Sequence, residues 1–212
     1  MLDLLYFDSD IAVCVKPAGV LSEGDGKNSM PYLLSLELKE RGIDASVFVV
    51  HRLDRETEGL TVFALNEASA AALSRSFQNG DAVKIYHALC VGVIEKDADI
   101  LCDLLFYDRG RGKSFVVDRE RKGVRKASLE YSVLRRFSDR TLLSVRLHTG
   151  RTHQIRVQFA SRGHALCGDR RYGAPSEYGN KLCLCAVSLS FTHPRTKERM
   201  SFETEMSNLL EK

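Results

Sequence analysis

VHRLDRETEGL, residues 50–60, lies between two apolar runs that have the composition of buried strands. Residues 47–50, VFVV, precede the charged segment, and residues 60–65, LTVFAL, follow it. The carboxylate of Asp54 is therefore held between two strands, together with a histidine and an arginine. Rigid placement of such groups is a requirement of a catalytic site, although an isolated Arg-x-Asp is more often a solvated turn with a local ion pair.

Length and composition indicate a globular protein with a sizeable core. The chain has 212 residues, of which 44% are apolar, and no linker or repeat divides it, so we expect a single domain over residues 1–212. No apolar run reaches the roughly 18 residues of a membrane span, and residues 1–5 lack the basic start of a signal peptide. We therefore expect a cytoplasmic protein without membrane contact.

Charge is distributed unevenly along the chain. The net charge is only +3, but residues 109–171 contain 17 Lys and Arg against 5 Asp and Glu, a local net charge of +12 that leaves −9 for the remainder. A basic stripe on an otherwise acidic protein favours a polyanionic partner, most often nucleic acid. The alternative is a solvated face whose charges are paired elsewhere in the fold.

The six cysteines indicate neither a disulfide framework nor a metal site. No pair has Cys-x-x-Cys spacing, and four of them lie in apolar, strand-like runs, namely Cys14, Cys90, Cys183 and Cys185. We expect reduced, buried cysteines of the kind found in cytosolic proteins.

Apolar periodicity and turn residues predict more strands than helices. A basic, glycine-rich loop is expected over 107–113. Because the strands are often joined by hairpins, an α+β fold with a largely antiparallel sheet fits best. Helices are expected between the cap Ser29 and Gly42, over 67–78 behind the cap Asn66, and from the turn at 149–152 to 161. Strands are expected over 11–15, 47–50, 60–65, 83–93, 100–105, 128–137, 141–147, 182–191 and 200–205.

Four short segments carry a resemblance to a known family. They are KPAG at 16–19, HRLD at 51–54 with Thr57 and Gly59-Leu60, KIYHA at 84–88, and LHTGRTHQIR at 147–156 continued by GDRRYG at 168–173. In this order and spacing they resemble the RluA-type pseudouridine synthases over nearly the whole chain. The sequence departs from the family pattern at Glu58, Gln158 and Cys185, where serine, histidine and histidine are common.

The resemblance implies both a fold and a reaction. The fold is a mixed, mainly antiparallel sheet crossed by an active-site cleft, with flanking helices and loops. The reaction converts uridine in structured ribosomal or transfer RNA to pseudouridine, and because it has no redox step we expect no cofactor and no metal. We also expect a monomer with no accessory N-terminal RNA-binding domain and no obligatory protein partner. Recognition without an accessory domain mildly favours a small RNA stem-loop as substrate.

Three residues match the catalytic positions of the family. Asp54 matches the aspartate that attacks the sugar or stabilises and deprotonates intermediates. Arg151 matches the arginine that pairs with this aspartate, with a phosphate contact as the alternative. Tyr86 matches a tyrosine whose ring can stack on uracil and whose hydroxyl can help remove the C5 proton, with a core aromatic as the alternative. His51 is expected to support the loop.

Further residues are expected to bind the RNA. A stacked uridine must be flipped out to react, and Arg52 can fill the vacated space with its planar guanidinium. Lys16 and Lys84 are expected as phosphate contacts or structural groups, and His153 and Gln154, at a helix start, as structural groups or base readers. The basic loop 109–126 is expected to follow the RNA phosphates.

Two rival functions remain open from the sequence. The first is a non-catalytic RNA-binding protein on the same scaffold, which the joint presence of Asp54, Tyr86 and Arg151 disfavours. The second is a carboxylate-dependent nucleoside hydrolase, an enzyme class that usually uses two carboxylates flanking the bond. Glu56 or Glu58 could serve as the second carboxylate.

Overall fold

The structure is a computed structural model in which residues 2–205 are described. They form two compact units, of which unit 1 contains residues 2–84 and 185–205 and unit 2 contains residues 85–184. The chain passes between the units within strands β5 (Val83–Val91) and β10 (Leu184–Thr192). This division into two units does not test the single domain expected over residues 1–212, which stays a prediction.

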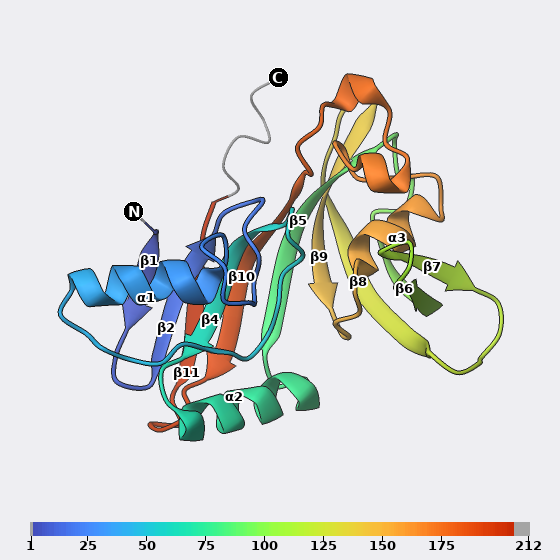
Figure 1. Cartoon of the computed structure of the whole chain (residues 1–212). Coiled ribbons are helices and arrows are strands. Elements are labelled where there is room, and N and C mark those ends of the chain that lie inside the picture. The colour runs from blue at the N-terminus through green and yellow to red at the C-terminus, as the bar shows by residue number, and fades with distance from the viewer. Residues whose placement is uncertain (1, 206–212) are drawn as a thin grey trace. The chain divides into compact units, whose positions relative to one another are not determined.

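Unit 1 is built around a small, mostly antiparallel sheet (Figure 1). The strands β4 (Glu58–Ala64) and β10 pair in parallel, and there the backbones approach so closely that a Cβ on Gly59 would lie 2.4 Å from the carbonyl oxygen of Ala186. Glycine is therefore required at this crossing, where its φ of +119° is also left-handed. The strands run in the order β1 (Leu4–Phe7), β2 (Ile11–Lys16), β4 (Glu58–Ala64) and β10, with β3 (Phe48–Val49) paired to β4 and β11 (Arg199–Glu203) paired to β10.

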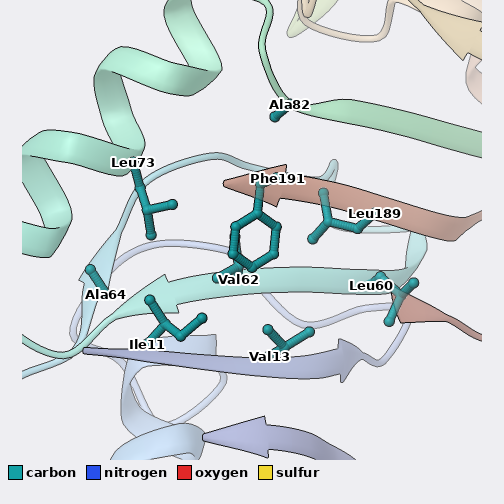
Figure 2. Packing of buried hydrophobic residues seen from close by; sticks show 9 residues of the cluster. All are labelled: Ile11, Val13, Leu60, Val62, Ala64, Leu73, Ala82, Leu189 and Phe191. Atoms are coloured by element: carbon teal, nitrogen blue, oxygen red, sulfur yellow. The ribbon is translucent and has the colours of Figure 1, made fainter. Parts of the chain in front are cut away.

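Two helices cover opposite faces of this sheet. Successive strand residues point to opposite faces, and along β2 Ile11 packs in one buried cluster while Ala12 packs in the other. The first cluster includes Leu73 of α2 (Glu67–Asn79), as Figure 2 shows, and the second includes Leu34 of α1 (Met30–Glu40). The central strands β2 and β4 are therefore buried on both sides, which accounts for their continuous apolar runs.

The helix ends in unit 1 agree with the sequence, with one difference in chemistry. Asn66 caps α2 by accepting a hydrogen bond from the Ser69 N–H at 2.9 Å, and Gly80 ends the helix in a left-handed conformation. Ser29 precedes α1 as expected, but its hydroxyl lies 2.7 Å from the carbonyl oxygens of Gly24 and Gly26 instead of capping the helix. It thereby fixes the glycine-containing loop before α1.

Unit 2 is an antiparallel sheet with one short helix, α3 (Gln154–Ala160). The helix packs on the sheet through Val157, which clusters with Leu105 and Ala127, and through Phe159, whose ring centroid is 5.4 Å from that of Tyr131. The strands run in the order β5, β9 (Arg140–Leu147), β8 (Val124–Arg136), β6 (Ala98–Asp108) and β7 (Lys113–Val117), and two 3₁₀ turns follow at Arg170–Tyr172 and Ser176–Tyr178.

The α+β class and its mainly antiparallel sheet are confirmed, and three local expectations are corrected. β1 was not expected, and the basic segment 109–126 is not one loop, because β7 and the start of β8 lie within it as two strands that both pair with β6. The third helix begins at Gln154 instead of the turn at 149–152. The active-site cleft expected across the sheet stays a prediction.

None of the helices among residues 2–205 is long and apolar enough to cross a membrane.

Candidate functional site

The turn that carries Asp54 connects β3 to β4 and is fixed by a buried ammonium group. Lys16 is fully buried, and its Nζ donates to the carbonyl oxygens of Arg55 at 3.0 Å and of Pro17 and Val20 at 2.8 Å. Burial lowers the pKa of Lys16 to about 8, although nearby carboxylates favour its charged form. These contacts support the structural alternative for Lys16, since three carbonyl oxygens already occupy its three donors.

A second set of hydrogen bonds fixes the residues on either side of Asp54. The Ser22 hydroxyl donates to the Leu53 carbonyl oxygen at 2.8 Å and lies 3.0 Å from the Leu53 N–H, which donates to it. The Thr57 N–H donates to the Asp54 carbonyl oxygen at 3.0 Å. The main chain of the turn is therefore held independently of the Asp54 side chain, which is half-buried.

His51 and Lys84 both lie against the ring of Phe77 in unit 1. The His51 ring stacks on Phe77 with centroids 4.4 Å apart, and its Nε2 accepts from the Val62 N–H at 3.1 Å. Burial, with a smaller effect of Lys84, lowers the pKa of His51 to about 3, so the ring stays neutral. The Lys84 Nζ is 5.5 Å from the Phe77 centroid, and burial lowers its pKa. This arrangement favours a supporting role for both residues.

Arg52 differs from its neighbours because it points to solvent. Its guanidinium pairs with Glu23, and both side chains are more than half exposed. An exposed pair of this kind is weak, so another anion can compete with Glu23 for Arg52 at small cost. Its position suits contact with a large substrate.

Tyr86 and Arg151 belong to unit 2, whereas Asp54 belongs to unit 1. Tyr86 lies on β5 opposite Val145 of β9 and is 5% exposed, so its ring has a fixed setting within the sheet. Arg151 lies in the exposed turn before α3, and its Nε donates to the Lys126 carbonyl oxygen on β8 at 3.0 Å.

His153 is built into the start of α3. It takes a left-handed conformation with φ of 55°, which is uncommon for a non-glycine residue. Its Nδ1 lies 3.0 Å from the Tyr172 hydroxyl, which accepts from the Ser114 N–H at 2.8 Å. These contacts support the structural alternative for His153.

The β7–β8 segment, residues 109–126, carries much of the positive charge that is expected to bind RNA. It contains eight Lys and Arg against two Asp and Glu, and its two strands flank β6. Beside this segment lies an open hollow of about 500 Å³ lined by Leu104, Glu120, Arg121, Val124, Arg125 and Lys126. The Lys126 ammonium pairs with exposed Glu120 at 3.2 Å, and an exposed pair of this kind is weak, so this surface is available to an anionic chain.

One group of side chains has metal-ligand chemistry, but its atoms are already engaged. Asp8, Asp10 and His193 offer ligand atoms within 4.8 Å of one another. The His193 Nδ1 accepts from main-chain N–H groups, and its Nε2 lies 2.9 Å from Asp8. The Asp10 carboxylate accepts from Asn66 and pairs with Arg195. These three side chains therefore connect the β1–β2 turn to the turn after β10 through hydrogen bonds.

Sequence reasoning missed two buried polar contacts in unit 2. Arg156 and Asp169 form a two-pronged ion pair, with Nε–Oδ2 and Nη2–Oδ1 distances of 2.7 and 2.8 Å. The Gln154 side chain contacts the turn that carries Arg151.

Three residues depart from the family pattern. Glu58 and Cys185 are directly paired across β4 and β10, and Gln158 donates to Asp103 of β6.

Comparison with known proteins gives a consistent result. Residues 10–161 match the sequence model of the family described as RNA pseudouridylate synthase. The chain is 38% identical to a protein named uncharacterized RNA pseudouridine synthase from Aquifex aeolicus, over 96% of this chain and 69% of that protein. It is 32% identical to the dual-specificity RNA pseudouridine synthase RluA of Haemophilus influenzae, over 96% and 93% of the two chains.

Solved structures show the same fold. The human RNA pseudouridylate synthase domain containing 1 protein superposes with a TM-score of 0.79 at 22% identity, covering 97% of this chain and 83% of that one.

A longer protein is also similar in sequence. The ribosomal large subunit pseudouridine synthase D of Neisseria meningitidis serogroup B is 32% identical over 98% of this chain, which spans 59% of that protein.

Proposed function

Because the chain belongs to the RNA pseudouridylate synthase family, as an RluA-type member that isomerises uridine in RNA, we propose that Asp54 is its reacting carboxylate. The observation that carries this proposal is the turn itself. Its main chain is held by Lys16 and by Ser22, so the carboxylate is presented on a rigid support. Such preorganisation is what a reacting group requires.

Arg151 and Tyr86 are proposed to complete the catalytic group. In the reaction the bond between C1′ and N1 breaks, the uracil turns, and C5 bonds to C1′ before losing its proton. Asp54 acts at the sugar as a nucleophile or as a stabilising charge. Arg151 orients the Asp54 carboxylate and favours its charged form, and Tyr86 stacks on the uracil.

Release of tritium from RNA labelled at uracil C5 tests this function against its rivals. Isomerisation replaces the C5 hydrogen, so label enters the solvent and pseudouridine appears in digested RNA. A binding protein would leave the label in place, and a nucleoside hydrolase would release free uracil. Detection of free uracil or of stable label with the purified protein would contradict the proposal.

The Tyr86 hydroxyl is expected to contribute to proton removal from C5. A Tyr86→Phe variant keeps the ring on β5 but removes the hydroxyl, and we expect kcat to fall by about 10²-fold or more, with KM for RNA nearly unchanged. Single-turnover tritium release measures the effect. A Tyr86→Phe enzyme with the wild-type rate would limit Tyr86 to stacking.

Contacts between the β7–β8 segment and RNA phosphates are expected to dominate affinity. Replacing Arg121 and Arg125 by glutamine should weaken RNA binding and lower the slope of log K against log salt by about one unit for each lost contact. Filter binding between low and physiological salt measures the slope. Lys39→Gln on α1, an exposed charge outside the β7–β8 segment, should leave the slope unchanged. An unchanged slope in the Arg121 and Arg125 variant would refute these contacts.

The substrate is proposed to be a stem-loop of ribosomal or transfer RNA whose uridine is flipped out, with Arg52 in the vacated space. Its support is the exposed, weakly paired setting of Arg52. We further propose that the enzyme acts as a monomer in the cytoplasm, where buried thiols such as Cys14 and Cys90 stay reduced.

A further inference from the structure

The turn that carries Arg151 is tied to strand β8 by one buried side chain, and we propose that Gln154 is a positioning residue for Arg151. Gln154 is the first residue of α3 and is 3% exposed. Its Oε1 accepts from the Arg151 main-chain N–H at 3.0 Å and from the Thr149 hydroxyl at 2.8 Å. Its Nε2 donates to the Ser128 carbonyl oxygen on β8 at 3.1 Å.

The partners of Gln154 leave no freedom in how its amide is oriented. The Arg151 N–H can only donate and the Ser128 carbonyl oxygen can only accept, so the amide oxygen must face the turn and the nitrogen must face β8. A reversed amide would place its nitrogen against the Arg151 N–H and its oxygen against the Ser128 carbonyl oxygen. Two donors would then face each other, as would two acceptors, which is strongly unfavourable in a buried setting. Gln154 therefore specifies one arrangement of the turn relative to the strand.

The same piece of β8 also holds the Arg151 side chain. The Ser128 N–H donates to the Thr149 hydroxyl at 2.9 Å, and the Ser128 carbonyl oxygen accepts from the Thr149 N–H at 3.1 Å. Two residues earlier, the Lys126 carbonyl oxygen accepts from Arg151 Nε at 3.0 Å. The main chain and the guanidinium of Arg151 are thus both fixed against residues 126–128. The Gln154 side chain links the Arg151 turn to this part of β8.

This proposal rests on the proposed role of Arg151 in the reaction. If Arg151 orients the reacting carboxylate, loss of its support should slow the chemical step while leaving RNA affinity nearly unchanged, because Gln154 is buried and does not reach the RNA. A misplacement of about 1 Å can cost about 10²-fold in rate. The expected signature is therefore a fall in kcat with little change in KM.

Gln154→Glu tests the proposal without changing the shape of the side chain. An ionised glutamate can still accept from Arg151 and Thr149, but it cannot donate to the Ser128 carbonyl oxygen, whereas a protonated glutamate can. We expect kcat to fall by about 10²-fold at pH 8 and to recover towards the wild-type value as pH falls and the new carboxyl takes up a proton. The wild-type enzyme should show no such recovery, and neither would a variant with a merely loosened fold.

Two further variants keep the test decisive. Gln158→Leu removes a buried amide of the same helix that contacts Leu101 and Asp103 but not the Arg151 turn, and it should lower the unfolding midpoint while keeping kcat. Thr149→Val removes the other hydrogen bond to Gln154 Oε1 and should lower kcat at every pH. All rates are measured below the unfolding midpoints.

The outcomes separate this proposal from the proposed function. If Arg151→Ala is inactive but Gln154→Glu has wild-type kcat at every pH, the positioning role is refuted and the role of Arg151 stands. If Arg151→Ala itself keeps kcat, both fail. A loss in Gln154→Glu that does not recover in acid also overturns the positioning role.

Discussion

Asp54→Asn is expected to abolish turnover while leaving RNA binding and folding intact. The asparagine has nearly the same shape but is a poor nucleophile and carries no charge, so kcat should fall by roughly 10³-fold or more. Folding should survive because the turn is held through the main chain of Leu53, Asp54 and Arg55. Tritium release and filter binding on the same preparation measure both properties.

Glu56→Gln is the matched control for Asp54→Asn. Glu56 lies in the same turn, is more than half exposed, and has Arg55 as an ion-pair partner at 3.8 Å. Its replacement should leave kcat within about twofold, because a single exposed pair is weak. A large loss in Glu56→Gln would instead indicate two working carboxylates and would revive the hydrolase alternative. An active Asp54→Asn protein would refute the assignment of Asp54.

Asp169→Asn should cause the largest loss of stability among single charge removals in unit 2. The Asp169 and Arg156 side chains are almost wholly buried and joined by two short hydrogen bonds. Removal of the negative charge takes from the buried Arg156 guanidinium the carboxylate that it pairs with, at a cost of about 3 to 5 kcal/mol in the free energy of unfolding. Urea unfolding followed by circular dichroism measures it.

Asp97→Asn provides the exposed counterpart. Asp97 pairs with Arg136 at 2.7 Å, but its side chain is 90% exposed, so the loss should stay below about 1 kcal/mol. If Asp169→Asn cost no more than Asp97→Asn, the buried pair would have no special role in holding α3 against the turn that follows it.

The sequence predicted the surroundings of Asp54 well because each feature there is local. Two apolar runs flank the turn, and the cap Asn66 and Gly80 bound the following helix, as observed. β7 was missed because its five residues, KSFVV, follow a run of glycines and charges. Its pairing with Leu104–Asp108 of β6 supplies the hydrogen bonds that make it a strand.

The start of α3 was placed too early for a similar reason. Thr149 looks like a helix cap, but its hydroxyl bonds to Ser128 and Gln154, and the left-handed His153 delays the first helical turn. The sequence placed Gln154 at a helix start with a structural or base-reading role, but it gave no signal of the hydrogen bonds that Gln154 makes. Its partner Ser128 lies 26 positions earlier, and only the folded sheet brings the two together.

The discontinuous make-up of unit 1 has a consequence for synthesis of the protein on the ribosome. Unit 2 is one continuous stretch, residues 85–184, whereas unit 1 combines the beginning of the chain with residues 185–205. The buried cluster around Ile11 and Leu60 needs Leu189 and Phe191 from β10 (Figure 2), and domains fold as units when their residues have emerged. Residue 54 leaves the ribosome early, but the unit that supports it is completed only after translation has passed β10.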